Sequence, residues 1–494
     1  MYLVAMATLV LGACSQEEMT NKDNDNAASA FVLTATHEGL APTHKGSAPT
    51  RTTLESGDAV NWDIGDQIKL VWNGGNVTSS PLTSAGSTAR FSFASNPGEG
   101  NVYAVYPASI TASYDGSTFS VTVPATQDGT FANAAIEVSE LSGGTDLNFK
   151  NLGSLLEIGV TASDTRSIVI GTYGGAKIAG TAPVTFSAGV PVVGEITGGT
   201  TVTLNVSGAG TYYAALLPVN ASEGFYVELH DAADGGGNII AKKIGRNALN
   251  LPRKKLKELG EIGESEVLAQ WSFINNAATM ADLAANWHSG NISSNSTYDD
   301  LTDVIGNTGE YIYSTDKGST MTFYQVDKTS FSNWTRLYLY TLGQPGFTSI
   351  WLDDAFQFDV DNDTALSLGA TIMMSFVLRI PSELLGCYML EYYANDAWHP
   401  VDDPDCPVQS KTISAKTYNY NIQETVANDE SIQTYYFPLK HSISAHSLKI
   451  RIRASAPYTC GGSNMTEPSI NTKQGRFRGE SKAGCISPVI KVTR

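Results

Sequence analysis

Short segments in which apolar and polar residues alternate recur along most of this chain, and clusters of turn-forming residues separate them. TVTLNV at residues 201–206 and SLKIRIRAS at residues 447–455 are two examples. An alternation with a period of two places the apolar side chains on one face of an extended strand, as in a half-buried sheet. The 46 glycines suit the many tight turns that such strands need. The pattern therefore predicts a nearly all-β protein.

The order of these segments predicts three domains, which is also what the length of 494 residues favours. Two successive series of strand-like segments predict β-sandwiches over 31–145 and 146–262, and the charged stretch 251–266 closes the second. Residues 267–494 differ in kind, because their strands are better marked and they hold five of the seven tryptophans: Trp271, Trp287, Trp334, Trp351 and Trp398. About eight strands over such a length predict a C-terminal jelly-roll-like β-sandwich.

The beginning of the chain has the features of a lipoprotein signal. An apolar run from Tyr2 ends in Leu11-Gly12-Ala13-Cys14, which has the form of a bacterial lipobox. We therefore predict a signal peptide over 1–14 and acylation of Cys14, which would anchor the protein to outer-membrane lipid at the cell surface. Residues 15–30 are polar and without periodicity, which predicts a disordered tether.

Five cysteines are an odd number for an exported protein. If Cys14 carries lipid, four remain, which is enough for two disulfides in an oxidising compartment. Proximity along the chain favours Cys387 with Cys406 and Cys460 with Cys485, although four cysteines allow three pairings. A zinc site is a weaker alternative, because the sequence has no CxxC pair and no nearby histidine doublet.

A predicted first strand precedes a long polar segment. Residues 31–36 alternate, with Phe31, Leu33 and Ala35 on one face. Residues 37–57 are rich in Pro, Gly, Ser and Thr, which predicts a linker, and Arg51 lies in it. An exposed loop arginine is a site for trypsin-like proteases. The alternative is that Arg51 is simply a solvated loop residue.

The first half of the chain resembles the fimbrillin family of lipoprotein pilins over residues 31–262. The resemblance lies in the order and spacing of six motifs: Arg51-Thr52-Thr53-Leu54, Trp62 with Gly65-Asp66-Gln67-Ile68, Tyr103-Ala104-Val105-Tyr106-Pro107, Pro124-Ala125-Thr126-Gln127, Phe149-Lys150-Asn151-Leu152-Gly153-Ser154-Leu155-Leu156, and Tyr213-Ala214-Ala215-Leu216-Leu217-Pro218. It implies two tandem transthyretin-like β-sandwiches, cleavage after Arg51 and loss of the first strand. The opened groove would then accept a strand from another pilin subunit, since an unfilled sheet edge is a template for strand addition.

The C-terminal half is similar, more weakly and by pattern, to galactose-binding-like jelly-roll modules. Aromatic faces stack on sugar rings while carboxylates and amides bind hydroxyls, so an aromatic-rich exported sandwich is a candidate glycan-binding head. The alternative is that such aromatics are core residues or cross-strand pairs. The candidates around one turn are Tyr392, Tyr393, Asn395, Asp396 and Trp398.

A basic patch is expected near the C-terminus. Residues 448–453 alternate, which places Lys449, Arg451 and Arg453 on one solvent face. These cations could receive an acidic glycan or an acidic face of a neighbouring subunit. A solvated sheet edge protected by charge is the alternative.

Several function classes receive no support from the sequence. The chain has 31 Lys and Arg residues against 49 Asp and Glu residues, a formal net charge of −18, which argues against nucleic acid as its partner.

The sequence contains no EF-hand calcium loop at Asp359, Asp361 and Asp363, because Thr364 and Ala370 occupy the positions that need Gly and Glu. We expect no metal and no cofactor, although another calcium geometry stays open.

The expected function is that of a pilus tip or accessory subunit that mediates adhesion and is not an enzyme. No HExxH, GxSxG, P-loop or Rossmann motif occurs in the sequence. Two alternatives remain, a monomeric surface glycan-binding lipoprotein and an extracellular hydrolase, because glycosidase carboxylates leave no local signature.

Overall fold

The computed structural model describes somewhat more than two-thirds of the chain. The described residues are 31–42, 60–270, 311–313, 319–324, 337–339, 345–347, 355–380, 382, 384–427, 429, 431–464, 475–477 and 488–494. The expected signal peptide, Cys14, the tether 15–30, Arg51 and Cys485 lie outside them.

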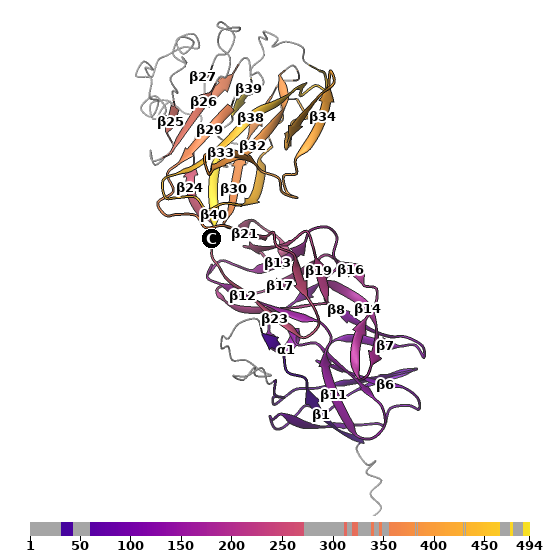
Figure 1. Ribbon diagram of the computed structural model, residues 1–494. Coiled ribbons are helices and arrows are strands. Elements are labelled where there is room, and N and C mark those ends of the chain that lie inside the picture. Colours follow the sequence, from indigo (N-terminus) through magenta and orange to yellow (C-terminus); the bar gives the residue numbers. More distant parts are fainter. Residues whose placement is uncertain are drawn as a thin grey trace, which may run out of the picture.

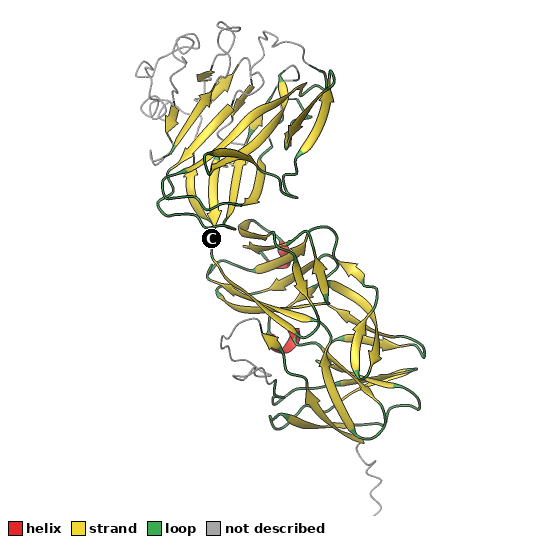
Figure 2. Ribbon diagram, in the orientation of Figure 1, coloured by secondary structure: helices red, strands yellow, loops and turns green. Residues whose placement is uncertain are grey.

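Almost all regular structure in the described residues is β, which confirms the predicted fold class (Figures 1 and 2). The helical elements there are a single turn, α1 (Phe131–Ala134), and a short 3-10 turn, η1 (Ala233–Gly235). No helix within the described ranges is long and apolar enough to cross a membrane.

The N-terminal strand lies inside the first sheet. Leu33 and Ala35 on this strand are fully buried and pack in one core with Trp62, Phe91 and Phe149. The seven strands run in the order β4 (Gly75–Thr78), β3 (Lys69–Trp72), β6 (Val102–Tyr106), β10 (Glu137–Leu141), β11 (Asp146–Asn151), β1 (Phe31–His37) and β5 (Thr88–Phe93).

A second core, which contains Val121, Leu155 and Ala182, involves two further sheets. One sheet consists of β15 (Val190–Val193), β14 (Ala179–Ser187), β8 (Phe119–Val123) and β7 (Thr111–Tyr114), with β16 (Thr197–Gly199) beside β14. The other consists of β18 (Gly210–Leu216), β12 (Ser154–Val160), β23 (Lys255–Ile262) and β2 (Ala41–Pro42). The pairing of β14 with β8, and of β11 with β10, joins strands across residues 145 and 146. Backbone hydrogen bonds between paired strands therefore link the two N-terminal units.

A third core lies on the opposite face of β12. Leu155 belongs to the second core and Leu156 to the third, because successive side chains of a strand point to opposite faces. The third core also receives side chains from a sheet of β21 (Ile239–Gly245), β20 (Phe225–His230), β13 (Ser167–Thr172), β17 (Thr201–Asn205) and β9 (Thr126–Gln127). A small ribbon of β19 (Val219–Ala221) and β22 (Leu249–Leu251) adds to it.

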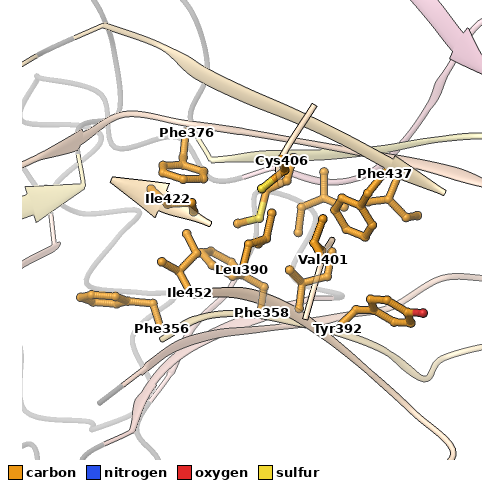
Figure 3. Close-up of a cluster of buried hydrophobic side chains, with 14 of the residues drawn as sticks. Phe356, Phe358, Phe376, Leu390, Tyr392, Val401, Cys406, Ile422, Phe437 and Ile452 are labelled. Carbon is orange, nitrogen blue, oxygen red and sulfur yellow. The ribbon is translucent and has the colours of Figure 1, made fainter. Parts of the chain in front are cut away.

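The C-terminal half forms a β-sandwich around the largest core, part of which Figure 3 shows. One sheet contains β24 (Glu266–Gln270), β40 (Val489–Thr493), β30 (Thr371–Phe376) and β37 (Gln433–Pro438). The other contains β25 (Tyr311–Tyr313), β26 (Thr320–Tyr324), β29 (Ala355–Val360), β38 (Leu448–Thr459), β32 (Leu385–Ala394) and β33 (Ala397–Pro400), with β36 (Ile422–Gln423) beside β32. The remaining strands are β27 (Leu337–Leu339), β28 (Pro345–Phe347), β39 (Gly475–Phe477) and β31 (Leu378–Arg379), and the hairpin of β34 (Gln409–Ile413) and β35 (Lys416–Tyr420).

A charged cluster joins the C-terminal sandwich to β20 and β21 of the N-terminal half. Figure 1 shows β21 at the end of the N-terminal half that faces the C-terminal sandwich. The Nζ atom of Lys242 lies 2.7 Å from Asp405 Oδ2 and 3.0 Å from Glu228 Oε1. Nearby, Arg246 Nε donates a hydrogen bond of 2.9 Å to Asp403 Oδ2. Because Lys242, Glu228 and Asp403 are mostly buried, these ion pairs are much less screened than surface pairs.

Candidate functional site

The N-terminal segment 31–42 runs through both N-terminal units. Within the first sheet, β1 lies between two strands, parallel to β11 and antiparallel to β5. The chain then enters the second core through Leu40, which is 2% exposed, and β2 pairs in parallel with β23. The predicted strand 31–36 is therefore confirmed, whereas the prediction that residues 37–57 form a linker is wrong at its start. Leu40 explains the difference, because one large buried side chain adds about 2 kcal/mol.

His37 ends β1 in a buried polar contact. Its Nδ1 atom contacts Glu137 Oε2, and its ring packs at a tilt against Trp62 with the centroids 3.6 Å apart. Trp62 in turn donates a hydrogen bond from Nε1 to the Ala35 carbonyl oxygen at 3.1 Å. The His37 Nε2 atom is buried and has no hydrogen-bond partner among the described residues. β1 is thus held firmly, but one of its polar groups is left unsatisfied.

Glu38 connects the segment to the end of the N-terminal half. Its carboxylate pairs with Arg253 through both oxygens, and Arg253 Nη2 lies 3.2 Å from Oε1. The Asn151 amide nitrogen Nδ2 also donates to the Glu38 carbonyl oxygen at 3.1 Å. Burial alone would raise the pKa of Glu38, but the hydrogen bond and charge of Arg253, with Lys150 and Lys254 nearby, lower it overall. The ionised form of Glu38 is therefore the one that holds the segment in place.

The outer face of the C-terminal sandwich gathers most of the predicted binding residues. On this face, β32 contributes Glu391 and Tyr393, and β38 contributes Lys449, Arg451 and Arg453. Trp398 of β33 lies directly opposite Tyr393, with ring centroids 5.3 Å apart. The basic patch and two of the candidate aromatics were predicted separately, and the pairing of β32 with β38 brings them together.

Tyr392 is not part of this face, so its proposed contact with a ligand is wrong. It is 1% exposed and packs in the C-terminal core beside Phe437 and Leu390 (Figure 3). Its hydroxyl hydrogen-bonds with His441 Nδ1 at 3.0 Å. The period of two in a strand explains this outcome, because Tyr392 and Tyr393 must point to opposite faces.

Asn395 and Asp396 form the two-residue turn between β32 and β33. Both have positive φ, 49° and 58°, and both are exposed. These values are those of a type I′ turn, whose twist matches that of the flanking strands and which favours Asn and Asp. The turn conformation alone accounts for these two residues.

Glu391 organises the charges of the outer face, and the sequence analysis did not single it out. It accepts a hydrogen bond from Arg451 Nε at 2.6 Å and two from Arg453, Nε at 3.0 Å and Nη2 at 3.1 Å. The guanidinium of Arg451 also lies 4.1 Å from the centre of the Trp398 ring. Strand alternation through Tyr393 could have placed Glu391 on this face, but only strand pairing places it between the two arginines.

A cleft of about 330 Å³ opens next to this cluster. Strand β35 of the β34–β35 hairpin forms one wall of the cleft, and the strands β32, β33 and β38 form the rest. The lining residues are Met389, Glu391, Pro400, Lys416, Thr417, Tyr418, Asn419, Arg453 and Ser455. A larger cavity of about 560 Å³ lies beside the first sheet, but its charged residues already accept protein hydrogen bonds, Asp66 from Asp63 and Tyr106, and Asp128 from Thr130. The smaller cleft is the better candidate because its charged groups come from separate strands.

The suggested Cys387–Cys406 disulfide is not formed. Cys387, Cys406 and Cys460 are free and buried. Cys406 packs in the C-terminal core, whereas Cys387 packs in a separate small cluster with Tyr420 and Ala456, so proximity along the chain is misleading here. Burial raises the pKa of Cys387 and Cys460 to about 11 and that of Cys406 to about 12. These thiols are consequently protonated at neutral pH.

Asp361, Asp363 and His446 lie close together on the surface, and their ligand atoms are within 4.8 Å of one another. Asp359, the third aspartate of the sequence pattern, instead pairs with Lys449 at 3.4 Å. All three grouped residues are exposed, and exposed acidic groups of this kind are common without a metal ion. We therefore assign no metal to them.

Comparison with known proteins finds similar structures but no matching family. No family model and no curated protein matches the chain. A putative cell adhesion protein from Bacteroides uniformis is 19% identical, with 48% of this chain and 94% of that chain covered and a TM-score of 0.27. A putative cell adhesion protein from Bacteroides fragilis is 12% identical, with 47% and 92% covered and a TM-score of 0.24. A structure of carbohydrate-binding modules from the β-sandwich superfamily is 10% identical, with 69% and 95% covered and a TM-score of 0.15. Similarities this low carry no functional weight.

Proposed function

We propose that this chain is a cell-surface adhesion protein of the fimbrial type, a tip or accessory subunit with a glycan-binding head. Cys14 would anchor the uncleaved chain to the outer membrane, and cleavage after Arg51 would release the upstream segment, which contains Cys14 and residues 31–42. The observation that carries this proposal is the position of that segment, which fills a place in two sheets and lies upstream of Arg51. Its removal would expose the backbone edges of β5, β11 and β23 to a strand from another pilin subunit.

The C-terminal strand supports a tip or accessory position. β40 lies between β24 and β30 in the sheet, and Ile490 and Val492 are buried in the C-terminal core. Donating this strand to another subunit would unfold the C-terminal sandwich. We therefore propose that the chain accepts a strand at its N-terminal half and presents its C-terminal sandwich outward.

Replacing Arg51 with alanine is expected to abolish assembly. Wild-type protein treated with a trypsin-like protease should be cut after Arg51 and then form complexes with pilin subunits that resist mild denaturation. The Arg51→Ala chain should stay uncut there and monomeric, because β1 keeps the groove filled. N-terminal mass mapping and gel analysis measure both properties. A stable monomer after cleavage of the wild type would contradict strand exchange and favour a monomeric glycan-binding lipoprotein.

Acid should release the cleaved segment. Because the folded pKa of Glu38 is lowered, its contribution to stability is fully present above its unfolded pKa, near 4.5, and is lost as the pH falls below that value. In cleaved protein without other subunits, we expect residues 31–51 to dissociate much faster at pH 3 than at pH 7. Size-exclusion chromatography and mass spectrometry measure this dissociation. Glu38→Gln is the control, which should release the segment at pH 7 and lose most of the pH dependence. Identical pH profiles for the two proteins would exclude Glu38 as the cause.

A further inference from the structure

The cleft on the outer face is positively charged in a protein that is strongly acidic overall. The chain has a formal net charge of −18. The cleft lining contains two cations, Lys416 and Arg453, against the single anion Glu391, a net charge of +1. Arg451 adds a second positive charge beside it, because it shares the carboxylate of Glu391 with Arg453. Such an inverted local charge favours an anionic ligand.

The two arginines are held in place before any ligand arrives. Arg453 binds both oxygens of Glu391 in a fork, and Arg451 is fixed between Glu391 and the Trp398 ring. Both arginine side chains are about one-fifth exposed, so they lose little conformational freedom on binding. The next anion along this face, Asp359, is already paired with Lys449. The two guanidinium groups beside the cleft are therefore preorganised.

The rest of the lining is suited to sugar hydroxyls. Thr417, Tyr418 and Asn419 on the hairpin and Ser455 on β38 supply hydroxyl and amide groups around the cations. We propose that this cleft binds a carboxylated saccharide, with Lys416 and Arg453 contacting the carboxylate. This inference rests on the proposed function, because it names the class of ligand that the proposed glycan-binding head would bind. An acidic peptide fits less well, because these hydroxyl and amide groups would find few hydroxyl partners on it.

The test is a calorimetric titration of the purified full chain with tetragalacturonate, which carries carboxylates, and with cellotetraose, which is neutral. We expect binding of tetragalacturonate and no heat with cellotetraose. Lys416→Gln should weaken binding by about tenfold, because it removes one charge-assisted contact. Lys416 is exposed at the hairpin, so this variant should fold normally. Raising the salt concentration should also weaken binding, as expected for partly exposed charges.

A matched control carries the same change of charge. Lys177→Gln alters an exposed lysine of the N-terminal half that does not line the cleft. This variant should bind like the wild type. Equal weakening in the Lys416→Gln and Lys177→Gln variants, binding of poly-glutamate as tight as that of tetragalacturonate, or equal affinity for cellotetraose would each overturn the proposal. Arg51→Ala should bind tetragalacturonate normally, so a failure of strand exchange and a failure of this cleft are distinguishable.

Discussion

Replacing Glu391 with alanine is expected to destabilise the C-terminal sandwich by about 3 kcal/mol, because it leaves two partly buried guanidinium groups without their carboxylate. The Glu391 side chain is 7% exposed and accepts hydrogen bonds from both Arg451 and Arg453. The two arginines, which lie two residues apart on the same face of β38, would then repel each other. Hydrogen exchange at the amides of β32 and β38 in the full chain measures the loss directly.

Asp359→Ala is the matched control for this result. Asp359 lies on the same face and pairs with Lys449, but the two side chains of this pair are far more exposed, 32% for Asp359 and 44% for Lys449. A surface pair of this kind contributes about 0.5 kcal/mol, so its removal should leave exchange in β32 and β38 almost unchanged. Equal effects of the two substitutions would show that Glu391 is an ordinary surface charge and that the arginines are not held by it.

Replacing Lys242 with alanine is expected to loosen the junction between the two halves of the chain and to cost about 3 kcal/mol, since it leaves Glu228 and Asp405 facing each other without a cation. Lys242 is 8% exposed and lies 4.6 Å from the centre of the Tyr226 ring. Burial would lower the pKa of Lys242, but its hydrogen bond to Asp405 and the charge of Glu228 raise it overall. Small-angle scattering and domain-resolved thermal unfolding measure the change.

Lys243→Ala removes the same charge from the neighbouring residue of β21. Lys243 is only half-buried, and burial lowers the pKa of its ammonium group without compensation from a carboxylate. This variant should keep the junction intact.

The raised pKa of Lys242 also means that the stability contributed by the Lys242 ion pairs is present at neutral pH and is lost only as the pH rises through that pKa. A junction that opens equally in both variants would assign the effect to lost packing of the β21 strand.

Strand alternation predicted part of the outer face from the sequence alone, although Arg453 is the only residue of the cleft lining among those predictions. It placed Lys449, Arg451 and Arg453 on one face, and it predicted the strand that contains Leu33 and Ala35. The same rule also opposes the grouping of Tyr392 with Tyr393, so the error at Tyr392 was avoidable without a structure. These predictions succeed because the direction of a side chain in a strand depends on its own position and not on distant residues.

Contacts between residues far apart in the chain were decided by the tertiary structure alone. Glu391 lies opposite Arg451 because β32 pairs with β38, and Glu38 meets Arg253 because the N-terminal segment crosses both units. The sequence also could not show that Cys387 and Cys406 stay free. They lie in two separate clusters, and this separation depends on how the two sheets of the sandwich pack. The sequence determined the all-β class and the faces of its strands, because these follow from local alternation. Which faces meet depends on strand order and register, which arise only when the whole core packs.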